Sequence, residues 1–140
     1  MSLAMSKDQR EEFLAGLHVG IVGIQRQGKG PLTVPIWYDY KPGGELWMIT
    51  QNTSIKGKLL AKTDRISLCV QTEVAPYQYV SIEGPFSMGE STAEQLLSMA
   101  IRYLGEEQGQ AYADSSGDGE GSIVVSIKPE TWYTVDYAKR

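Results

Sequence analysis

The segment Leu46-Trp-Met-Ile-Thr-Gln-Asn-Thr-Ser-Ile-Lys-Gly-Lys-Leu-Leu60 changes from a strand pattern to a helix pattern. Residues 46–50 are mostly large and apolar, which indicates a short buried strand. Residues 52–54 are polar, and each is a candidate N-cap for a following helix. Ile55, Leu59 and Leu60 then fall on one face of that helix. We therefore expect a buried strand that runs directly into a short helix.

Two lysines, Lys56 and Lys58, occupy the first turn of this helix. The free N–H groups of a helix start favour anions, by about 0.3–1 kcal/mol per charge. Cations are unfavourable there unless an anion shares the site, and the same N–H groups bind phosphate readily. We interpret the junction at Ser54 as a phosphate-binding helix start. The alternative is that the lysines are solvated and Ser54 is only a cap, and the glycine-rich pattern of a nucleotide P-loop is absent.

The length of 140 residues predicts a single domain over residues 1–140, which can bury a core without disulfides or metals. Residues 1–4 are expected to be an expression scar or a disordered start, with Met5 as the natural first residue. No apolar run reaches the roughly 20 residues of a membrane span, so we expect no membrane partner. The single cysteine, Cys69, excludes an internal disulfide. These features predict a cytoplasmic protein.

The charge of the chain restricts its possible partners. A net charge of −4 argues against nucleic-acid binding, which needs a broad basic surface. Positive charge is concentrated locally, at Lys56, Lys58, Lys62 and Arg65. A compact basic patch on an acidic protein favours a small anionic ligand over a polymer.

Short apolar runs between glycine- and proline-containing turns predict a mainly β chain with a few helices. Strands are expected at residues 18–25, 32–40, 46–50, 66–71, 77–88, 122–127 and 132–137. Helices are expected at residues 7–17, 54–63 and 92–104, with one further helical turn at 108–113. Thr92 and Gln95 have the spacing of a capping box. Sequential hairpins favour antiparallel pairing, and barrel closure removes exposed edges, so we expect a closed antiparallel barrel.

The expected strand at residues 32–40 contains a proline at its centre. Pro35 cannot donate to a sheet ladder, so the backbone beside it is left unpaired on that side. Unpaired backbone next to Trp37 could face a planar ligand. The alternative is an edge strand protected by proline, with Trp37 as core packing.

No convincing set of acid, base, nucleophile or metal ligands is present in the sequence. His18 is the only histidine, and no serine has the surroundings of a nucleophile elbow. No ligand spacing supports a metal site, so we expect none. A redox cofactor supplies its own reactive atom, while the protein contributes binding and orientation. A phosphate socket, an open strand and nearby aromatic residues are the parts that such a protein needs.

A family resemblance agrees with this interpretation. Its motifs occur in the order Val34-Pro-Ile-Trp-Tyr38, Leu46-Trp-x-x-Thr50, Ser54-x-Lys56-x-x-Leu59-Leu60 and Asp64-Arg-Ile-Ser-Leu68, followed by 77–84. Their order and spacing resemble the pyridoxamine 5'-phosphate oxidase-like split-barrel family of flavin and deazaflavin proteins, over roughly residues 10–137. The resemblance implies an antiparallel six- or seven-stranded split β-barrel of the FMN-binding type. It also implies a homodimer with two cofactors at the interface.

The resemblance also assigns the binding residues by position. Ser54, Lys56 and Lys58 would hold the cofactor phosphate with Thr50 beside them; Val34, Pro35, Ile36 and Trp37 would lie against the ring; Gln78 and Tyr79 would line the site. The chain lacks the C-terminal Arg/His pattern of true pyridoxamine-phosphate oxidases, which argues against vitamin B6 oxidation. Its short form resembles actinobacterial members that use the deazaflavin F420, whose polyglutamate tail would suit Lys58 and Lys62. FMN is the second candidate.

The leading hypothesis is an oxidoreductase that transfers hydride between bound F420 or FMN and a small organic substrate. The second hypothesis is a non-catalytic carrier or storage protein for a flavin, a deazaflavin or haem. Turnover with reduced cofactor separates the two.

Overall fold

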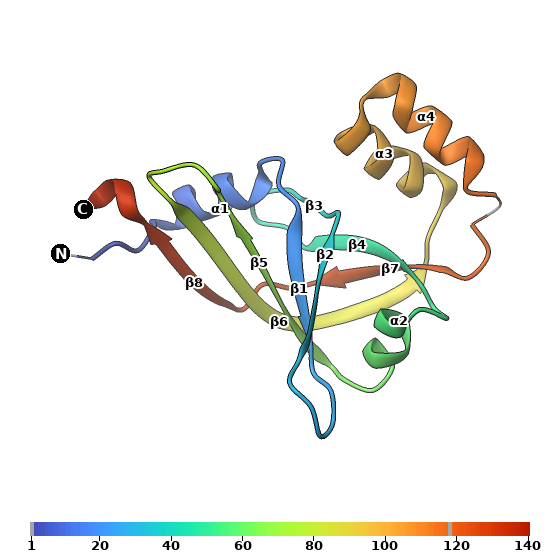
Figure 1. The fold of residues 1–140 in the computed structure, drawn as a ribbon, viewed down its shortest axis with the longest axis horizontal. Coiled ribbons are helices and arrows are strands. Elements are labelled where there is room, and N and C mark those ends of the chain that lie inside the picture. Colours follow the sequence, from blue (N-terminus) through green and yellow to red (C-terminus); the bar gives the residue numbers. More distant parts are fainter. Residues whose placement is uncertain (1, 118) are drawn as a thin grey trace.

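The computed structural model describes residues 2–117 and 119–140, which form an eight-stranded sheet and four α-helices (Figure 1). The helices are α1 (Lys7–Ala15), α2 (Ile55–Leu60), α3 (Ala93–Leu104) and α4 (Glu106–Ser115), with a 3₁₀ turn at Tyr137–Lys139. The strands are β1 (Gly20–Ile24), β2 (Leu32–Ile36), β3 (Asp39–Tyr40), β4 (Leu46–Gln51), β5 (Arg65–Gln71), β6 (Gln78–Glu90), β7 (Ser122–Ile127) and β8 (Thr131–Asp136). The prediction of a mainly β chain is confirmed.

The sheet is antiparallel throughout, and its pairing path runs β2-β1-β5-β6-β7-β4-β3, with β8 paired to β6. The end strands β2 and β3 are consecutive in the chain, yet within the described residues they do not pair with each other. The sheet therefore curls without closing. The predicted split barrel is confirmed, whereas the full closure expected from the hairpins is wrong.

Strand β6 belongs to both halves of the curled sheet. On one edge, Tyr79–Pro85 pair with β5. On the other edge, Gln78–Glu83 pair with β8 and Phe86–Glu90 pair with β7. Between these two parts, a Cβ at Gly84 would overlap the carbonyl oxygen of Lys128. Glycine lets the β7–β8 connection cross β6 at the point where the partner strand changes.

The predicted strand at residues 32–40 is interrupted, because its two ends pair with different neighbours. β2 pairs with β1, and β3 pairs with β4. Tyr38 lies between them with a fully buried side chain, whose hydroxyl donates to Leu14 O at 2.7 Å. Burial raises the pKa of the Tyr38 phenol. Strand β2 thus ends before Tyr38, whose buried side chain is bonded to α1 in the gap between β2 and β3.

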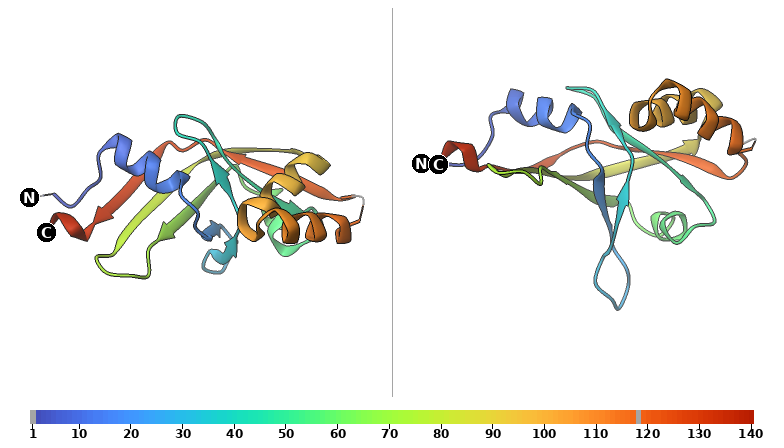
Figure 2. Two further views of the ribbon diagram at one scale, coloured as in Figure 1. Left: turned by 90° about the horizontal axis from the view of Figure 1, so that it is seen from above. Right: turned by 45° about the horizontal axis from the view of Figure 1, so that its top comes forward.

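The core lies on the concave side of the sheet, where alternate residues of each strand face inward. Apolar side chains fill it, and the fully buried ones include Val22, Leu46, Met48, Leu68, Val80, Ile82, Val125 and Ile127. α1 covers this core with Leu14, which has no exposed surface. α1 and the α3–α4 pair lie on one side of the sheet and α2 on the other (Figure 2). None of the helices in residues 2–117 and 119–140 is long and apolar enough to span a bilayer.

The α3–α4 pair is fixed internally and to the barrel. Where only a helical turn was expected at 108–113, α4 is ten residues long, and a Cβ at Gly109 would lie 2.7 Å from Ile101 Cα. Close packing of α4 on α3 thus requires glycine there. Arg102 Nε donates to Tyr38 O at 2.9 Å, and Tyr103 OH donates to His18 O at 2.6 Å. These bonds join α3 to the segments that follow α1 and β2.

Candidate functional site

A cavity of about 440 Å³ lies between the sheet and the α3–α4 pair. We call its two sides the sheet wall and the helix wall. The sheet wall consists of Val19, Pro35, Ile36, Trp37, Ile49, Thr50, Gln51 and Ser122. The helix wall consists of Leu96, Met99, Ala100, Tyr112 and Ser116. The cavity is thus assembled from strand ends of the barrel and from the insertion between β6 and β7.

Trp37 is held between two tyrosines at the edge of the cavity. Its indole stacks on Tyr103 with 4.9 Å between ring centroids and 5° between the planes. Tyr112 lies 5.6 Å away at an angle of 51°. Tyr103 covers one face of the indole, and Trp37 and Tyr112 both belong to the cavity lining.

β2 is an edge strand of the sheet, with Pro35 opposite Ile21 of β1. The proline therefore lies in an edge strand, as the alternative of a proline-protected edge strand predicted. Pro35, Ile36 and Trp37 also line the cavity, as the ligand-facing interpretation requires. Val34 packs against the core and is outside the described lining of the cavity. The free edge of β2 leaves backbone groups available beside the Trp37 ring.

The β4–α2 junction has the predicted strand-to-helix structure. Ser54 is the N-cap of α2, and its hydroxyl accepts from Gly57 N at 3.0 Å and donates to Gln51 O at 2.7 Å. The Thr50 hydroxyl lies 3.2 Å from that of Ser54. A Cβ at Gly57 would overlap Gln51 O, so α2 packs directly on the backbone of the strand that precedes it.

Lys58 of α2 and Lys62, which follows the helix, lie at a second hollow. This hollow has a volume of about 650 Å³, and its lining includes Lys58, Lys62, Asn52, Met88 and Glu90. Gln51 lines the first cavity and the adjacent Asn52 lines the second, so the two hollows are separated by one peptide unit at the β4–α2 junction. Lys56, which also belongs to α2, is half-buried. The structure thus places cations next to the cavity but not within it.

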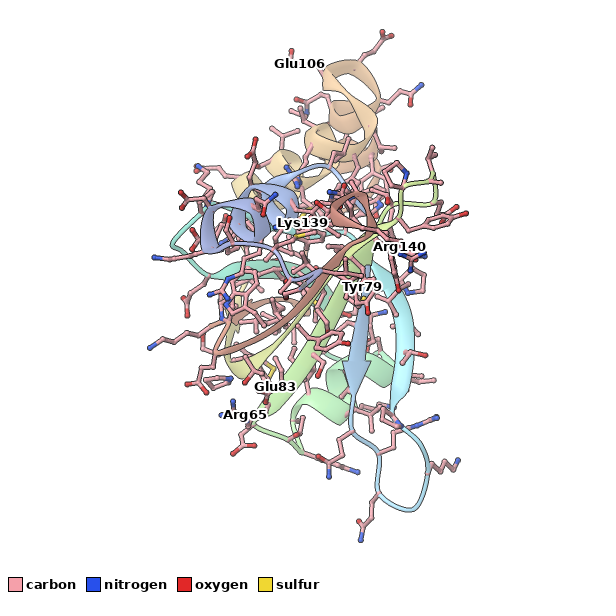
Figure 3. All side chains as sticks on the ribbon, turned by 90° about the vertical axis from the view of Figure 1, so that its left-hand side faces the viewer. Arg65, Tyr79, Glu83, Glu106, Lys139 and Arg140 are labelled. Carbon is pink, nitrogen blue, oxygen red and sulfur yellow. The ribbon has the colours of Figure 1, made fainter. Side chains whose placement is uncertain are left out.

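Gln78 and Tyr79 lie apart from the cavity. Gln78 lines a small hollow beneath α1 with Met5 and Phe13. Tyr79 stacks on Tyr133 with 6.0 Å between ring centroids. Figure 3 shows Tyr79 beside the C-terminal turn, far from Glu106 at the α3–α4 connection. Within one chain, the predicted site residues therefore fall into separate groups, and Gln78 and Tyr79 do not meet the others.

The cavity offers little acid–base chemistry. Of the lining residues in the described part of the chain, only Tyr112 has a titratable side chain. Gln51 Nε2 donates to Ser122 Oγ at 2.9 Å, and Ser116 Oγ donates to Tyr112 O at 2.8 Å. The polar groups of the wall are thus largely paired with one another. Such a cavity can bind and orient a ligand, and the reactive atom must come from that ligand.

Several lining residues were absent from the predicted site. They are the helix-wall residues together with Val19, Ile49, Gln51 and Ser122. Gln51 and Ser122 are 71 positions apart and meet only because β4 pairs with β7. Nothing in their local sequence marks them, since no motif surrounds either residue. The sequence feature nearest to the missed residues was the polar loop after α4.

Comparisons with known proteins identify the fold. No protein-family model matches the chain, and no curated protein matches it. The chain is similar to the crystal structure of the conserved hypothetical protein Rv2991 from Mycobacterium tuberculosis, with TM-score 0.78 and 21% identity over 99% of this chain and 89% of that one. A structure named F420 reductase has TM-score 0.74 and 17% identity over 88% and 94%. A pyridoxamine 5'-phosphate oxidase-like protein from Listeria innocua has TM-score 0.66 and 14% identity over 91% and 96%. At these identities the likeness concerns the fold, and the chain has the split-barrel fold of the pyridoxamine 5'-phosphate oxidase-like proteins.

Proposed function

We propose that this protein is an oxidoreductase that binds F420 or FMN and transfers hydride between the cofactor and a small organic substrate. The observation that supports this most directly is the pair of hollows at the β4–α2 junction. One is lined by rings and other uncharged groups, and the other has Lys58 and Lys62 in a lining that also includes Glu90 and apolar side chains. A flavin or deazaflavin has the matching composition, with a planar ring system joined to an anionic tail. One of the proteins with the same fold is an F420 reductase.

The residues at the junction fit each part of such a cofactor. Pro35, Ile36 and Trp37 offer apolar surface and the free edge of β2 to the ring. Thr50 and Ser54 offer two neighbouring hydroxyls to the phosphate, and Lys56 and Lys58 offer charge. Binding there would share the Ser54 hydroxyl with the cap of α2. The bound cofactor would supply the hydride, while these side chains hold its ring against the sheet wall.

The second hollow favours F420 over FMN. Lys58 and Lys62 both line it, and its volume exceeds what one phosphate requires. A polyglutamate tail would extend past Lys58 and Lys62, whose two ammonium groups outnumber the one carboxylate, that of Glu90, in the described lining. FMN ends at its phosphate and would leave Lys62 without a role.

We propose that the outer face of the sheet joins two copies of the chain. Ile21, Cys69, Ser81 and Tyr133 are successive cross-strand partners and form one row over β1, β5, β6 and β8. Ile21 and Tyr133 expose 43% and 64% of their surfaces, which is unusual for large side chains in one patch.

This row of four residues begins beside the cavity and runs to the edge of the exposed patch that it forms. Pro35 of the sheet wall lies opposite Ile21 at one end of the row. The patch is bounded by a polar cluster in which Arg65 donates to Glu83 at 3.0 Å (Figure 3) and to Glu130 at 2.7 Å. In a homodimer formed here, Tyr79 of one chain would approach the cofactor of the other.

A second candidate function is a non-catalytic cofactor carrier. The scarcity of titratable groups in the described cavity lining favours it, because a carrier needs no acid or base. Haem is the weaker cargo. The only histidine in the sequence, His18, stacks on Phe13 and has Nε2 3.1 Å from Phe13 O, so this nitrogen is already engaged.

Titration of the purified protein with FMN and with F420, followed by fluorescence, tests the proposal. We expect saturable binding of one cofactor per chain, with F420 bound more tightly. Reduced cofactor is then mixed with a panel of small organic acceptors, and its reoxidation is followed by absorbance. Binding without reoxidation above the protein-free rate would indicate the carrier, and binding of neither cofactor would overturn both assignments.

A further inference from the structure

We propose that the helix wall is a substrate subsite for uncharged, planar aromatic molecules, and that Tyr112 sets this preference. The proposal rests on the proposed function for one point, that the cofactor ring occupies the sheet wall. The space between that ring and the helix wall then belongs to the second reactant. The helix-wall residues, which no sequence motif marked, determine which reactant this space can bind.

The charge of the wall selects against ions. The described lining residues include no Asp, Glu, Lys, Arg or His, and the nearby lysines face the second hollow. Moving an ion from water into such surroundings costs several kcal/mol unless a partner charge accompanies it. A neutral molecule with one or two polar atoms avoids this cost.

The shape of the wall favours flat rings. Met99 and Ala100 are buried and present an apolar base, while Tyr112 stands at the mouth with 44% of its surface exposed. Trp37 and Tyr112 are inclined by 51° with 5.6 Å between ring centroids, so the two rings pack against each other and form one aromatic surface in the cavity lining. Offset-stacked and inclined ring pairs at centroid distances of about 4.5–7 Å are mutually attractive. A planar ligand would stack on the Tyr112 side of this surface, because the space between the two rings is already filled.

The aromatic surface is fixed in place by the framework of α3. Tyr103 fixes Trp37 by stacking and also bonds to the backbone at His18, so the indole cannot turn freely. Gly109 brings α4 against Ile101, which sets the distance of Tyr112 from the barrel. Tyr112 is therefore positioned before any ligand arrives. Such preorganisation favours selective binding because less ordering is needed on association.

Two isosteric probes test the charge preference without any cofactor. Naphthalene-2-sulfonamide is neutral and naphthalene-2-sulfonate is anionic, while their ring systems are identical. Calorimetric titration of the cofactor-free protein should show the sulfonamide binding at least roughly tenfold more tightly. Cyclohexanesulfonamide, which lacks a flat ring, should bind more weakly than the naphthalene compound. Equal affinities for the two naphthalene probes, or binding of neither, would overturn the subsite.

A charge-swap variant tests the role of Tyr112. In Tyr112→Arg the cation should lower the sulfonamide-to-sulfonate preference by roughly tenfold or reverse it. Ala111→Arg is the matched control, since it adds the same charge on the exposed side of the same helix. An unchanged preference in Tyr112→Arg, equal to that of Ala111→Arg, would refute the assignment. Cofactor titration of the same variants is read separately: intact cofactor binding with no probe selectivity rejects the subsite alone, and selective probe binding without cofactor binding rejects the redox function alone.

Discussion

The ring of Tyr103 lies parallel to the indole of Trp37, with 4.9 Å between centroids, and its hydroxyl donates to His18 O at 2.6 Å. The same hydroxyl accepts from Tyr38 N at 3.0 Å. One side chain of α3 thus supports the cavity through its ring and joins two backbone segments through its oxygen. Substitutions at Tyr103 can therefore test the packing of its ring and the hydrogen bonds of its hydroxyl separately.

Tyr103→Phe keeps the stacking and removes the oxygen. It leaves the half-buried N–H of Tyr38 without its partner, which should lower the free energy of unfolding by about 1–3 kcal/mol. Urea denaturation followed by circular dichroism measures this. Tyr77→Phe, at an exposed tyrosine, is the control and should change stability little. A Tyr103→Phe protein as stable as the control would show that the hydroxyl bonds are not stabilising.

Gly57→Ala tests the packing of α2 on β4. The new Cβ would overlap Gln51 O, and displacement of the helix should lower the free energy of unfolding by about 1–3 kcal/mol. Gly30→Ala is a fair comparison, because nothing lies within 4 Å of its Cβ position and its φ is not in the left-handed region. If both variants unfold at the same urea concentration, α2 has room to move and the junction is less rigid than described.

Lys56→Ala tests the anion site. A charge-assisted hydrogen bond contributes about 1.5–3 kcal/mol, so the dissociation constant for the cofactor should rise roughly 10–150-fold without unfolding the protein. Lys58→Ala should act in the same direction and more strongly on F420 than on FMN, because Lys58 lines the second hollow. Lys29→Ala, in the β1–β2 hairpin loop, removes the same charge elsewhere. Unchanged affinity for both cofactors in Lys56→Ala would show that the assigned phosphate position is wrong.

His18 makes stability depend on pH near neutrality. Burial lowers its pKa from the ordinary 6.5, with a further lowering from nearby Arg102, while the bond to Phe13 O acts in the opposite direction. Below that ordinary value the unfolded chain binds a proton that the folded chain does not, so stability falls as pH decreases. The loss ends once pH passes the lowered, folded-state pKa. Urea midpoints of wild type and His18→Gln between about pH 7.5 and 5.5 isolate this slope, which should be smaller in the variant.

Ile21→Glu tests the proposed dimer face. The substitution places a charge in the apolar row, and in a two-fold interface it does so twice, so dissociation should become at least roughly tenfold easier. Sedimentation velocity over a range of protein concentrations gives the monomer–dimer equilibrium. Val74→Glu is the matched control, since Val74 is 78% exposed and lies outside the row. Equal sedimentation of wild type and Ile21→Glu would exclude this face as the interface.

Local signals in the sequence predicted local structure well. Thr92 and Gln95 form the predicted capping box, and Ser54 caps α2, because each arrangement depends on neighbours within three positions. The break at Tyr38 could not be predicted in this way. It depends on Leu14 O, which lies 24 positions away and is placed by α1. Only one helical turn was expected at 108–113, whereas Gly109 lets α4 lie close to Ile101 and so supports a helix of ten residues.

Only those residues of the candidate site that belong to a sequence motif could be predicted. Pro35, Trp37 and Thr50 were found because strand patterns and the family resemblance mark them, and the structure brings them to one cavity. Tyr112 and Ser122 belong to segments with no distinctive pattern. They reach the cavity through pairing and helix packing that span most of the chain.

Strand β6 is one continuous strand that belongs to two regions of the molecule. Gln78–Glu83 forms part of the proposed dimer face, and Phe86–Glu90 leads into α3. No loop separates these parts, and the Gly84 crossing leaves no room for slippage between them. The two parts of β6 are therefore coupled through one continuous backbone. Occupation of the helix-wall cavity should slow amide hydrogen exchange in residues 78–83, which are outside the described lining of the cavity.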